Sequence, residues 1–366
     1  MKVICSKEEC IGCLNCYNVC KFGAIEVLKD DLDFIYAQVD GDKCVGCGAC
    51  KWKCPILQKY NTERELINEC YASVNKDEEI CSKSSSGGMF YELAKVVLDK
   101  EGVVYGAAFD SKFNVIHKRI DKLENIKSLM GSKYVQSDIG NIYGEVKKDL
   151  ENELQVLFTG TPCQIAALNI YLGKQYDNLY LQDFICHGVG SKKILDKHIS
   201  EIKQSYKLKN IKQMNFRDKI SGWKNFSFSI YTKEGNYAED LTKDNFMKTF
   251  LKNLSLRTSC YTCNYKGNKR QSDITLADFW GIEKVLPNFD AKNGVSAVIL
   301  NTAKGKSLFE NIKDKIVYEK VDFADISKNN ICLENPPIYN RHRQDFIKDI
   351  NEGIELSEIK EEYYTR

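Results

Sequence analysis

Hydrophobic residues along this 366-residue chain follow two periods, which divide most of it into expected strands and helices. Short apolar runs between polar or glycine residues are typical of buried strands, whereas apolar positions repeating every three to four residues indicate amphipathic helices. Strands are expected at residues 102–109, 155–158, 179–185, 211–216, 226–232, 274–279 and 295–301. Helices are expected at residues 89–100, 139–151, 162–172, 192–204, 338–350 and 355–362. Because the two kinds of element alternate, the pattern predicts an α+β or α/β fold.

The first 58 residues carry a different pattern, in which cysteines recur at fixed spacing. Two runs have the form Cys-x2-Cys-x2-Cys-x3-Cys, namely Cys10, Cys13, Cys16, Cys20 and Cys44, Cys47, Cys50, Cys54. In a two-cluster ferredoxin, the first three cysteines of each run bind one 4Fe-4S cluster and the fourth reaches across to the other. The spacing therefore predicts one ligand set of Cys10, Cys13, Cys16 and Cys54, and a second of Cys44, Cys47, Cys50 and Cys20.

Disulfides and zinc sites are the alternative interpretations of these cysteines. Eight cysteines at this double spacing favour iron–sulfur clusters over both alternatives. The motif often has proline after its fourth cysteine. Pro55 follows Cys54 in that way, whereas Lys21 follows Cys20. The turn-like residues after Lys21 still suit a short strand, so the prediction stands.

Composition and charge narrow the class of protein. The chain has 53 basic and 51 acidic residues, a net charge of +2, so no strong field favours nucleic acid or a membrane surface. No apolar run approaches the roughly 18 residues that span a bilayer. The cysteine motif begins close to Met1 without an apolar leader, so we expect a cytoplasmic protein, in which cysteines serve metals more often than disulfides. The expected division is a ferredoxin-like domain at 1–58, a polar linker at 59–70 and a larger domain at 71–366.

Two short stretches of the larger domain suggest chemistry. The sequence SSSGG at 84–88 directly precedes an expected helix, and small residues before free helical N–H groups suit a phosphate. A plain helix cap and loop is the commoner origin of such a stretch. The sequence GTPC at 160–163 joins a strand to a helix and places Cys163 in the first helical turn, where the helix dipole favours a thiolate. That cysteine is a nucleophile, a metal ligand or simply a buried residue.

Further cysteines follow at the ends of expected strands. Cys186 precedes His187, and Cys260 and Cys263 form a Cys-x2-Cys pair. With Cys163 they are numerous enough for a third cluster, although such a pair alone fits structural zinc or a redox dithiol equally well. The cysteines without a partner spacing are expected to be ordinary thiols; they are Cys5, Cys70, Cys81 and Cys332.

Six motifs of the larger domain, taken together in order, resemble the family of the coenzyme F420 hydrogenase/dehydrogenase beta subunit. They are SSSGG at 84–88, GSKY at 131–134, GTPCQ at 160–164, CHG at 186–188, CYTC at 260–263 and SDITLADFWG at 272–281. The resemblance runs from about residue 70 to about residue 300. It implies an FAD-containing oxidoreductase with iron–sulfur clusters, in which flavin exchanges hydride with coenzyme F420 or, in relatives, electrons pass from ferredoxin to an organic substrate. The larger domain would then be a mixed α/β flavin-binding domain.

The resemblance also implies roles for individual residues. Flavin and its pyrophosphate would be bound by Ser85, Ser86, Gly87, Gly88, Gly131, Ser132, Lys133 and Tyr134, with Thr161 and Gln164 contacting flavin or cluster. A third 4Fe-4S cluster would be held by Cys163, Cys186, Cys260 and Cys263, with a partial or zinc site as the alternative. The expected catalytic residues are Lys133, as a charge near a flavin carbonyl, and His187, in proton transfer. Their structural alternatives are an exposed loop lysine and a hydrogen-bonded core histidine.

Three functions follow from these predictions. The first is a ferredoxin-dependent iron–sulfur flavoenzyme that reduces or oxidises a small organic molecule. The second is a coenzyme F420 oxidoreductase that passes electrons to ferredoxin or a partner protein. The third is a non-catalytic electron relay without flavin. No G-x-G-x-x-G follows a strand, which disfavours NAD(P), and self-association into a homo-oligomer is compatible with the sequence. No nucleic-acid or membrane partner is expected.

Overall fold

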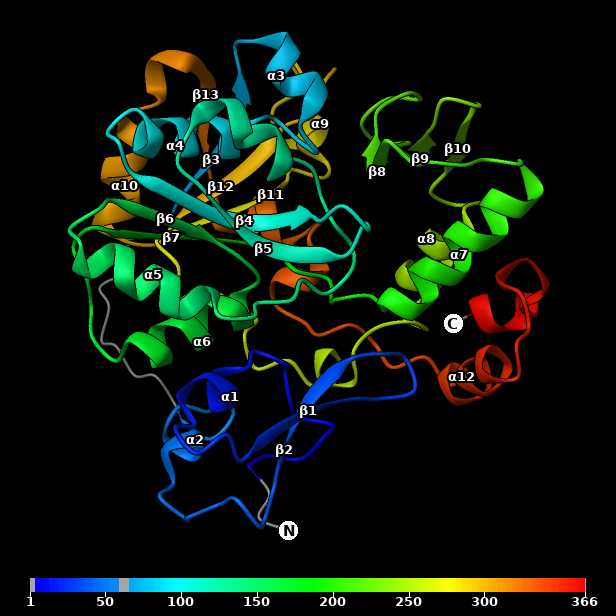
Figure 1. Cartoon of the computed structure of the whole chain (residues 1–366). Coiled ribbons are helices and arrows are strands. Elements are labelled where there is room, and N and C mark those ends of the chain that lie inside the picture. Colours follow the sequence, from blue (N-terminus) through cyan, green and yellow to red (C-terminus); the bar gives the residue numbers. More distant parts are fainter. Residues whose placement is uncertain (1–3, 59–65, 366) are drawn as a thin grey trace.

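A large mixed sheet organises most of the chain. The computed structural model describes residues 4–58 and 66–365, and in it eight strands lie in the order β13-β3-β12-β11-β7-β6-β4-β5 (Figure 1). Their bounds are β3 Glu69–Asn75, β4 Val103–Phe109, β5 Val115–Ile120, β6 Val156–Thr159, β7 Leu179–Phe184, β11 Ile274–Asp278, β12 Ser296–Leu300 and β13 Ile316–Val321. The neighbours β4, β6, β7 and β11 are parallel, and all other pairs are antiparallel.

Helices cover both faces of this sheet, as parallel strands require. The helices α4 (Met89–Leu98) and α10 (Ala303–Glu310) pack on one face against side chains such as Val104 and Leu157. The helices α5 (Ile142–Glu151) and α6 (Pro162–Leu172) pack on the other, against Val103, Tyr105 and Phe158. Because successive strand residues point to opposite faces, the short apolar run of β6 is buried on both sides.

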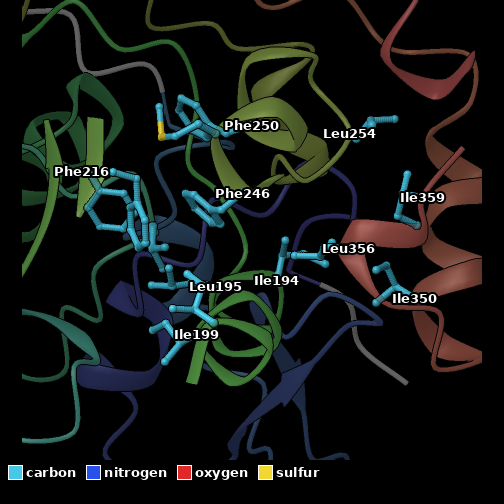
Figure 2. Packing of buried hydrophobic residues seen from close by; sticks show 14 of the residues in the cluster. Ile194, Leu195, Ile199, Phe216, Phe246, Phe250, Leu254, Ile350, Leu356 and Ile359 are labelled. Carbon is cyan, nitrogen blue, oxygen red and sulfur yellow. The ribbon is translucent and has the colours of Figure 1, made fainter. Parts of the chain in front are cut away.

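A second group of elements lies beside the sheet. The antiparallel strands β8 (Gln213–Asp218), β9 (Ser227–Tyr231) and β10 (Asn236–Asp240) form a three-stranded sheet. It packs with α7 (Lys192–Ser205), α8 (Asn245–Leu251) and α12 (Arg343–Asn351). Figure 2 shows the side chains of α7, α8 and the C-terminal segment that meet in this core, among them Ile194, Phe246 and Leu356.

The ferredoxin-like domain is small and lies against both of these groups (Figure 1). It consists of α1 (Asn15–Val19), the hairpin β1 (Ile25–Lys29) and β2 (Ile35–Val39), and α2 (Ala49–Trp52). The hairpin tip inserts Leu32 and Phe34 into the core around α7. On the other side, the Asn15 amide donates to the Ala167 carbonyl of α6 at 2.8 Å, and the Lys53 ammonium donates to the Ile170 carbonyl at 2.8 Å.

The remaining described elements are short. They are α3 Glu78–Lys83, α9 Ile282–Val285, α11 Phe323–Ser327 and the 3-10 turns η1 Leu123–Ser128, η2 Thr258–Cys260, η3 Lys313–Lys315, η4 Ile331–Leu333, η5 Leu356–Glu358 and η6 Glu361–Tyr364.

The predicted fold class is confirmed, and several predicted boundaries are wrong. The expected helix at 355–362 is instead two 3-10 turns. The buried residues Leu356 and Ile359 are three positions apart, which is the spacing of a 3-10 helix. The helix expected from 139 begins at Ile142, and the one expected from 338 begins at Arg343. The strands β2, β3, β5, β10 and β13 were not predicted.

The expected linker at 59–70 is too long at its C-terminal end. The strand β3 begins at Glu69 and pairs with β12 and β13, whereas residues 59–65 lie outside the described part of the chain. In the described ranges, the helices are all too short or too polar to cross a lipid bilayer.

Candidate functional site

Two cavities in the ferredoxin-like domain gather the two predicted ligand sets. The first is lined by Cys10, Cys13, Cys16 and Cys54, and the second by Cys20, Cys44, Cys47 and Cys50. The crossing of the fourth cysteine, expected from the spacing, is therefore the arrangement found. In the described chain no three His, Cys, Asp or Glu side chains are placed to hold a single metal ion. A 4Fe-4S cluster is larger than an ion, and its ligands surround a cavity as these cysteines do.

Cys5 was expected to be an ordinary thiol, but it lines the first cavity. Its hydrogen bonds to Cys10 and Cys54 are the main cause that lowers the pKa of Cys10 to about 5 and that of Cys54 to about 7. Thiolates are the form that binds iron. No local signal points to this contact, because Cys5 stands outside the x2 and x3 spacing.

Arg257 joins the first cavity to the larger domain. The residue is 4% exposed and donates from Nε to the Cys10 carbonyl at 2.7 Å and from Nη2 to the Ile35 carbonyl at 2.7 Å. Its Nη1 donates to Gln136 Oε1 at 2.8 Å. Gly12, at a φ of 66°, leaves room for this guanidinium, since a Cβ there would lie 2.9 Å from Nη1. Sequence reasoning missed Arg257, which stands in no motif.

The four cysteines predicted to hold a third cluster come from separate elements. Cys163 lies in the first turn of α6, Cys186 follows β7, and Cys260 and Cys263 belong to the segment around η2. All four are partly buried. Burial and then the neighbouring thiols raise the pKa of Cys163 to about 12, and burial also raises the pKa of Cys186 and Cys260. Because other thiols of the set affect the pKa of Cys163 and of Cys186, the four cysteines lie near one another in the fold. That they bind a cluster stays a prediction.

Tyr265 lies between this third thiol set and the first cavity. Its hydroxyl donates to the carbonyl of Pro55, the residue after Cys54, at 3.0 Å. Burial raises the pKa of Tyr265, and the charges of Cys163 and Cys13 add to that effect. Cys13 also belongs to the core formed by α5 and α6. Tyr265 therefore adjoins both the first cavity and the third thiol set.

The two predicted flavin-binding stretches are in direct contact. Ser132 donates from its backbone N–H and its hydroxyl to Ser85 Oγ, at 2.8 and 2.9 Å. The Ser86 hydroxyl donates to the Val295 carbonyl at 2.8 Å. Gly87 fits tightly against β3 and β12, because a Cβ there would lie 2.4 Å from the Ser73 carbonyl oxygen. Gly88, with a φ of 84°, is the N-cap residue of α4.

Lys133 does not extend as an exposed loop lysine. Its ammonium is buried and donates to the carbonyls of Leu129, Met130 and Gly131 at 3.1, 2.8 and 3.2 Å. Burial lowers its pKa to about 7. These contacts hold the 128–131 turn in place, and the predicted role near flavin stays a prediction.

Two cations near these stretches were missed from the sequence. Lys219, after β8, donates to the Cys81 and Ser86 carbonyls at 2.7 and 3.0 Å, and burial lowers its pKa to about 8. Arg217, in β8, pairs with Asp278 and lies near Tyr134. Its side chain is 6% exposed, and its guanidinium lies over the Phe226 ring and beside the Tyr134 hydroxyl; among the described residues, Nε and Nη2 have no partner in hydrogen-bonding geometry. Buried, unsatisfied N–H groups beside the SSSGG and GSKY stretches fit an anionic or carbonyl-bearing ligand.

The other predicted site residues have defined contacts. Thr161 and Gln164 form the capping box of α6, and the Thr161 hydroxyl lies 3.0 Å from Cys163 Sγ. His187 contacts Cys332 Sγ through Nδ1 at 3.3 Å and Asn253 Oδ1 through Nε2 at 2.7 Å. Their predicted cofactor and proton-transfer roles are not tested by these contacts.

Comparison with known proteins assigns the two parts of the chain. Residues 9–56 match the family model of the 4Fe-4S dicluster domain. Residues 154–326 match the family model that describes the C terminus of the beta subunit in coenzyme F420 hydrogenase/dehydrogenase. Residues 154–326 therefore belong to the family of the coenzyme F420 hydrogenase/dehydrogenase beta subunit, and residues 9–56 to the 4Fe-4S dicluster domains. The chain is thus an iron–sulfur protein related to coenzyme F420 hydrogenase/dehydrogenase, and its N-terminal two-cluster ferredoxin domain is the one that the sequence predicted.

Known proteins resemble either most of the chain or its ferredoxin-like domain alone. The F subunit of the F(420)H(2) dehydrogenase of Methanosarcina mazei is 22% identical over 84% of each chain. An uncharacterized ferredoxin of Methanocaldococcus jannaschii is 38% identical over 15% of this chain and 70% of its own length. A chain of the F420-reducing [NiFe] hydrogenase complex from Methanosarcina barkeri aligns with a TM-score of 0.49 and 17% identity, over 81% of this chain and 94% of its own.

Proposed function

We propose that this protein couples two-electron chemistry at a bound FAD to one-electron transfer through 4Fe-4S clusters, with coenzyme F420 as the two-electron reactant. The observation that carries the proposal is the position of Arg257 and Tyr265. Both lie between the first cavity of the ferredoxin-like domain and the third thiol set of the larger domain. Two iron–sulfur sites separated by buried side chains within one chain suit a path for single electrons.

The residues around the SSSGG and GSKY stretches fit the requirements of FAD. Arg217 offers Nε–H and Nη2–H to a pyrophosphate or a ring carbonyl, and Asp278 holds its guanidinium in place. Lys219 fixes the SSSGG backbone through the Ser86 carbonyl. When bound, FAD would supply the conversion between two-electron and one-electron chemistry. The protein's contribution is to bind it, to orient it and to place it beside the third thiol set.

Coenzyme F420 is favoured by the relative from Methanosarcina mazei, because the similarity spans 84% of both chains and includes both parts of this protein. A second candidate is a ferredoxin-dependent enzyme acting on another small organic molecule. The fused ferredoxin-like domain favours that candidate, since it supplies an entry for single electrons within the same chain.

The test uses anaerobically purified, full-length protein. We expect a flavin absorption band that is bleached by reduced coenzyme F420. Bleaching by reduced ferredoxin but not by reduced coenzyme F420 would support the second candidate, and the absence of flavin would leave an electron relay.

Arg217 supplies the matched test of the flavin site. Arg217→Met is expected to lower the FAD content at least several-fold, because the guanidinium is buried and its two free N–H groups are lost. Arg217→Lys keeps a positive charge beside Asp278, so it serves as the control for a folding defect caused by loss of that ion pair. Arg341→Met changes an exposed arginine and should leave the FAD content unchanged.

A further inference from the structure

The two cavities of the ferredoxin-like domain have different surroundings. The first faces the larger domain, where Cys13 is 8% exposed and Asn15 is fully buried against α6. Around the second cavity, Cys47 is exposed, as are Phe22 at 52%, Val45 at 61% and Trp52 at 71%. The first cavity therefore faces the larger domain, whereas the surroundings of the second cavity are exposed to solvent.

The exposed apolar residues lie next to one another at the second cavity. Phe22 and Val45 line the second cavity together with Cys47 and Gly48. The Trp52 indole adjoins Gly48, since a Cβ on that glycine would lie 3.6 Å from Trp52 Nε1. We call Phe22, Val45, Cys47 and Trp52 the cluster-two face. Exposed apolar groups that adjoin one another mark sites of protein association, and tryptophan is a frequent anchor in such interfaces.

The charges beside this face indicate the kind of partner. Lys21 and Lys51 directly precede Phe22 and Trp52 and are exposed. In the described chain neither ammonium belongs to an ion pair, whereas Lys43, farther along, pairs with Asp40 at 2.8 Å and lies near Glu26 and Asp42. Two exposed lysines next to the exposed aromatic rings complement an acidic surface.

We propose that the cluster-two face is the docking surface for an acidic protein that carries a one-electron centre. The proposal rests on the proposed function for the fate of the electrons. Cys20, Cys44, Cys47 and Cys50 would hold a cluster that would exchange one electron, and no atoms, with the partner's centre, so that one centre would gain the electron that the other loses. Because the first cavity is covered by the larger domain, an external carrier reaches the chain at this face.

The experiment uses full-length, cluster-loaded protein and a reduced, acidic two-cluster ferredoxin as the probe. Stopped-flow absorption gives the second-order rate of cluster reduction. We expect Trp52→Glu and the double variant Lys21→Glu/Lys51→Glu to lower this rate at least tenfold, on the order of the effect that rim charges have on association. The wild-type rate should fall as salt is added, because screening weakens the attraction. Reduction by dithionite should be unchanged in every variant.

Matched controls change the same residue types elsewhere. Ile338→Glu alters a side chain that is 72% exposed on the larger domain, and Lys127→Glu alters an exposed lysine of η1; both should react at the wild-type rate. Trp52→Ser removes the ring without adding charge. It tests the face if Trp52→Glu loses its clusters.

The outcomes separate this proposal from the proposed function. Wild-type rates in all variants of the face would overturn it, and so would a wild-type protein that dithionite reduces but ferredoxin does not. FAD content and its bleaching by reduced coenzyme F420 are read independently. A protein without FAD whose reduction by ferredoxin still depends on Trp52 and the two lysines would support the docking surface and refute the proposed function.

Discussion

Arg257 of the larger domain donates its Nε–H to the carbonyl oxygen of Cys10 in the ferredoxin-like domain, at 2.7 Å. The two residues are 247 positions apart in the chain. The same guanidinium also binds Ile35 and Gln136, so one buried cation secures the backbone of a predicted cluster ligand and the hairpin next to it. This contact fixes where the first cavity lies relative to the third thiol set.

Replacing Arg257 should loosen this junction. We expect Arg257→Ala to lower the free energy of unfolding by about 2–3 kcal/mol, because three hydrogen bonds of a buried charged group are lost. Chemical denaturation followed by circular dichroism measures the change. Arg341→Ala, at an exposed arginine, is the control and should change stability by less than about 0.5 kcal/mol. Equal stability of both variants would show that the junction does not depend on Arg257.

The third thiol set makes a prediction about iron content. Cys163→Ser and Cys260→Ser should each lose about four iron atoms per chain, the content of one 4Fe-4S cluster. Cys70→Ser changes a buried cysteine of β3 outside all three sets and should keep the wild-type content. Iron and acid-labile sulfide analysis on anaerobic protein gives the result. Unchanged iron in both ligand variants would exclude a third cluster at these cysteines.

Cys5 should substitute for a lost neighbour in the first cavity. Since its thiol contacts Cys10 and Cys54, we expect Cys10→Ser to retain more than about half of the iron of the first cluster. Cys13→Ser, at a buried thiol whose pKa is influenced by Cys16, Cys10 and Cys54, and the double variant Cys5→Ser/Cys10→Ser should both lose that cluster. Iron analysis and electron paramagnetic resonance of the reduced protein compare the three variants. Equal losses in Cys10→Ser and Cys13→Ser would refute the substitution.

His117 should make stability depend on pH. The imidazole is 4% exposed, donates from Nε2 to the Thr159 carbonyl at 3.0 Å and stacks on Phe158. Burial lowers its pKa from 6.5 to about 4. Between these values the unfolded chain binds a proton that the folded chain does not, so stability falls as the pH drops from 6.5 to 4.

The loss attributable to His117 is about 3 kcal/mol, from about 1.4 kcal/mol for each pKa unit. His117→Gln keeps a hydrogen-bond donor for the Thr159 carbonyl, but its side chain does not titrate. Between pH 6.5 and pH 4 its free energy of unfolding should therefore fall by about 3 kcal/mol less than that of the wild type. Denaturation at a series of pH values measures both proteins, and His342→Gln serves as the control. Parallel pH profiles of the wild type and His117→Gln would contradict the assigned pKa.

The elements that the sequence predicted best are those whose pattern is local. The strand and helix on either side of Cys163 were expected at 155–158 and 162–172 and are found as β6 and α6. Several of the missed strands lie at sheet edges: β5 and β13 are the outer strands of the large sheet, and β10 is an outer strand of the three-stranded sheet. Their residues are only half apolar, and the partner strand decides their conformation.

The sequence by itself determined the two ferredoxin ligand sets and the family, because cysteine spacing and short motifs depend on neighbours within a few residues. The tertiary structure alone decided that Arg257 and Tyr265 lie between the first cavity and the third thiol set, that Cys5 faces Cys10, and that Arg217 and Lys219 adjoin the SSSGG and GSKY stretches. These contacts join segments that are distant in the chain. Their partners are chosen by the packing of the sheet, the helices and the ferredoxin-like domain, which no local pattern encodes.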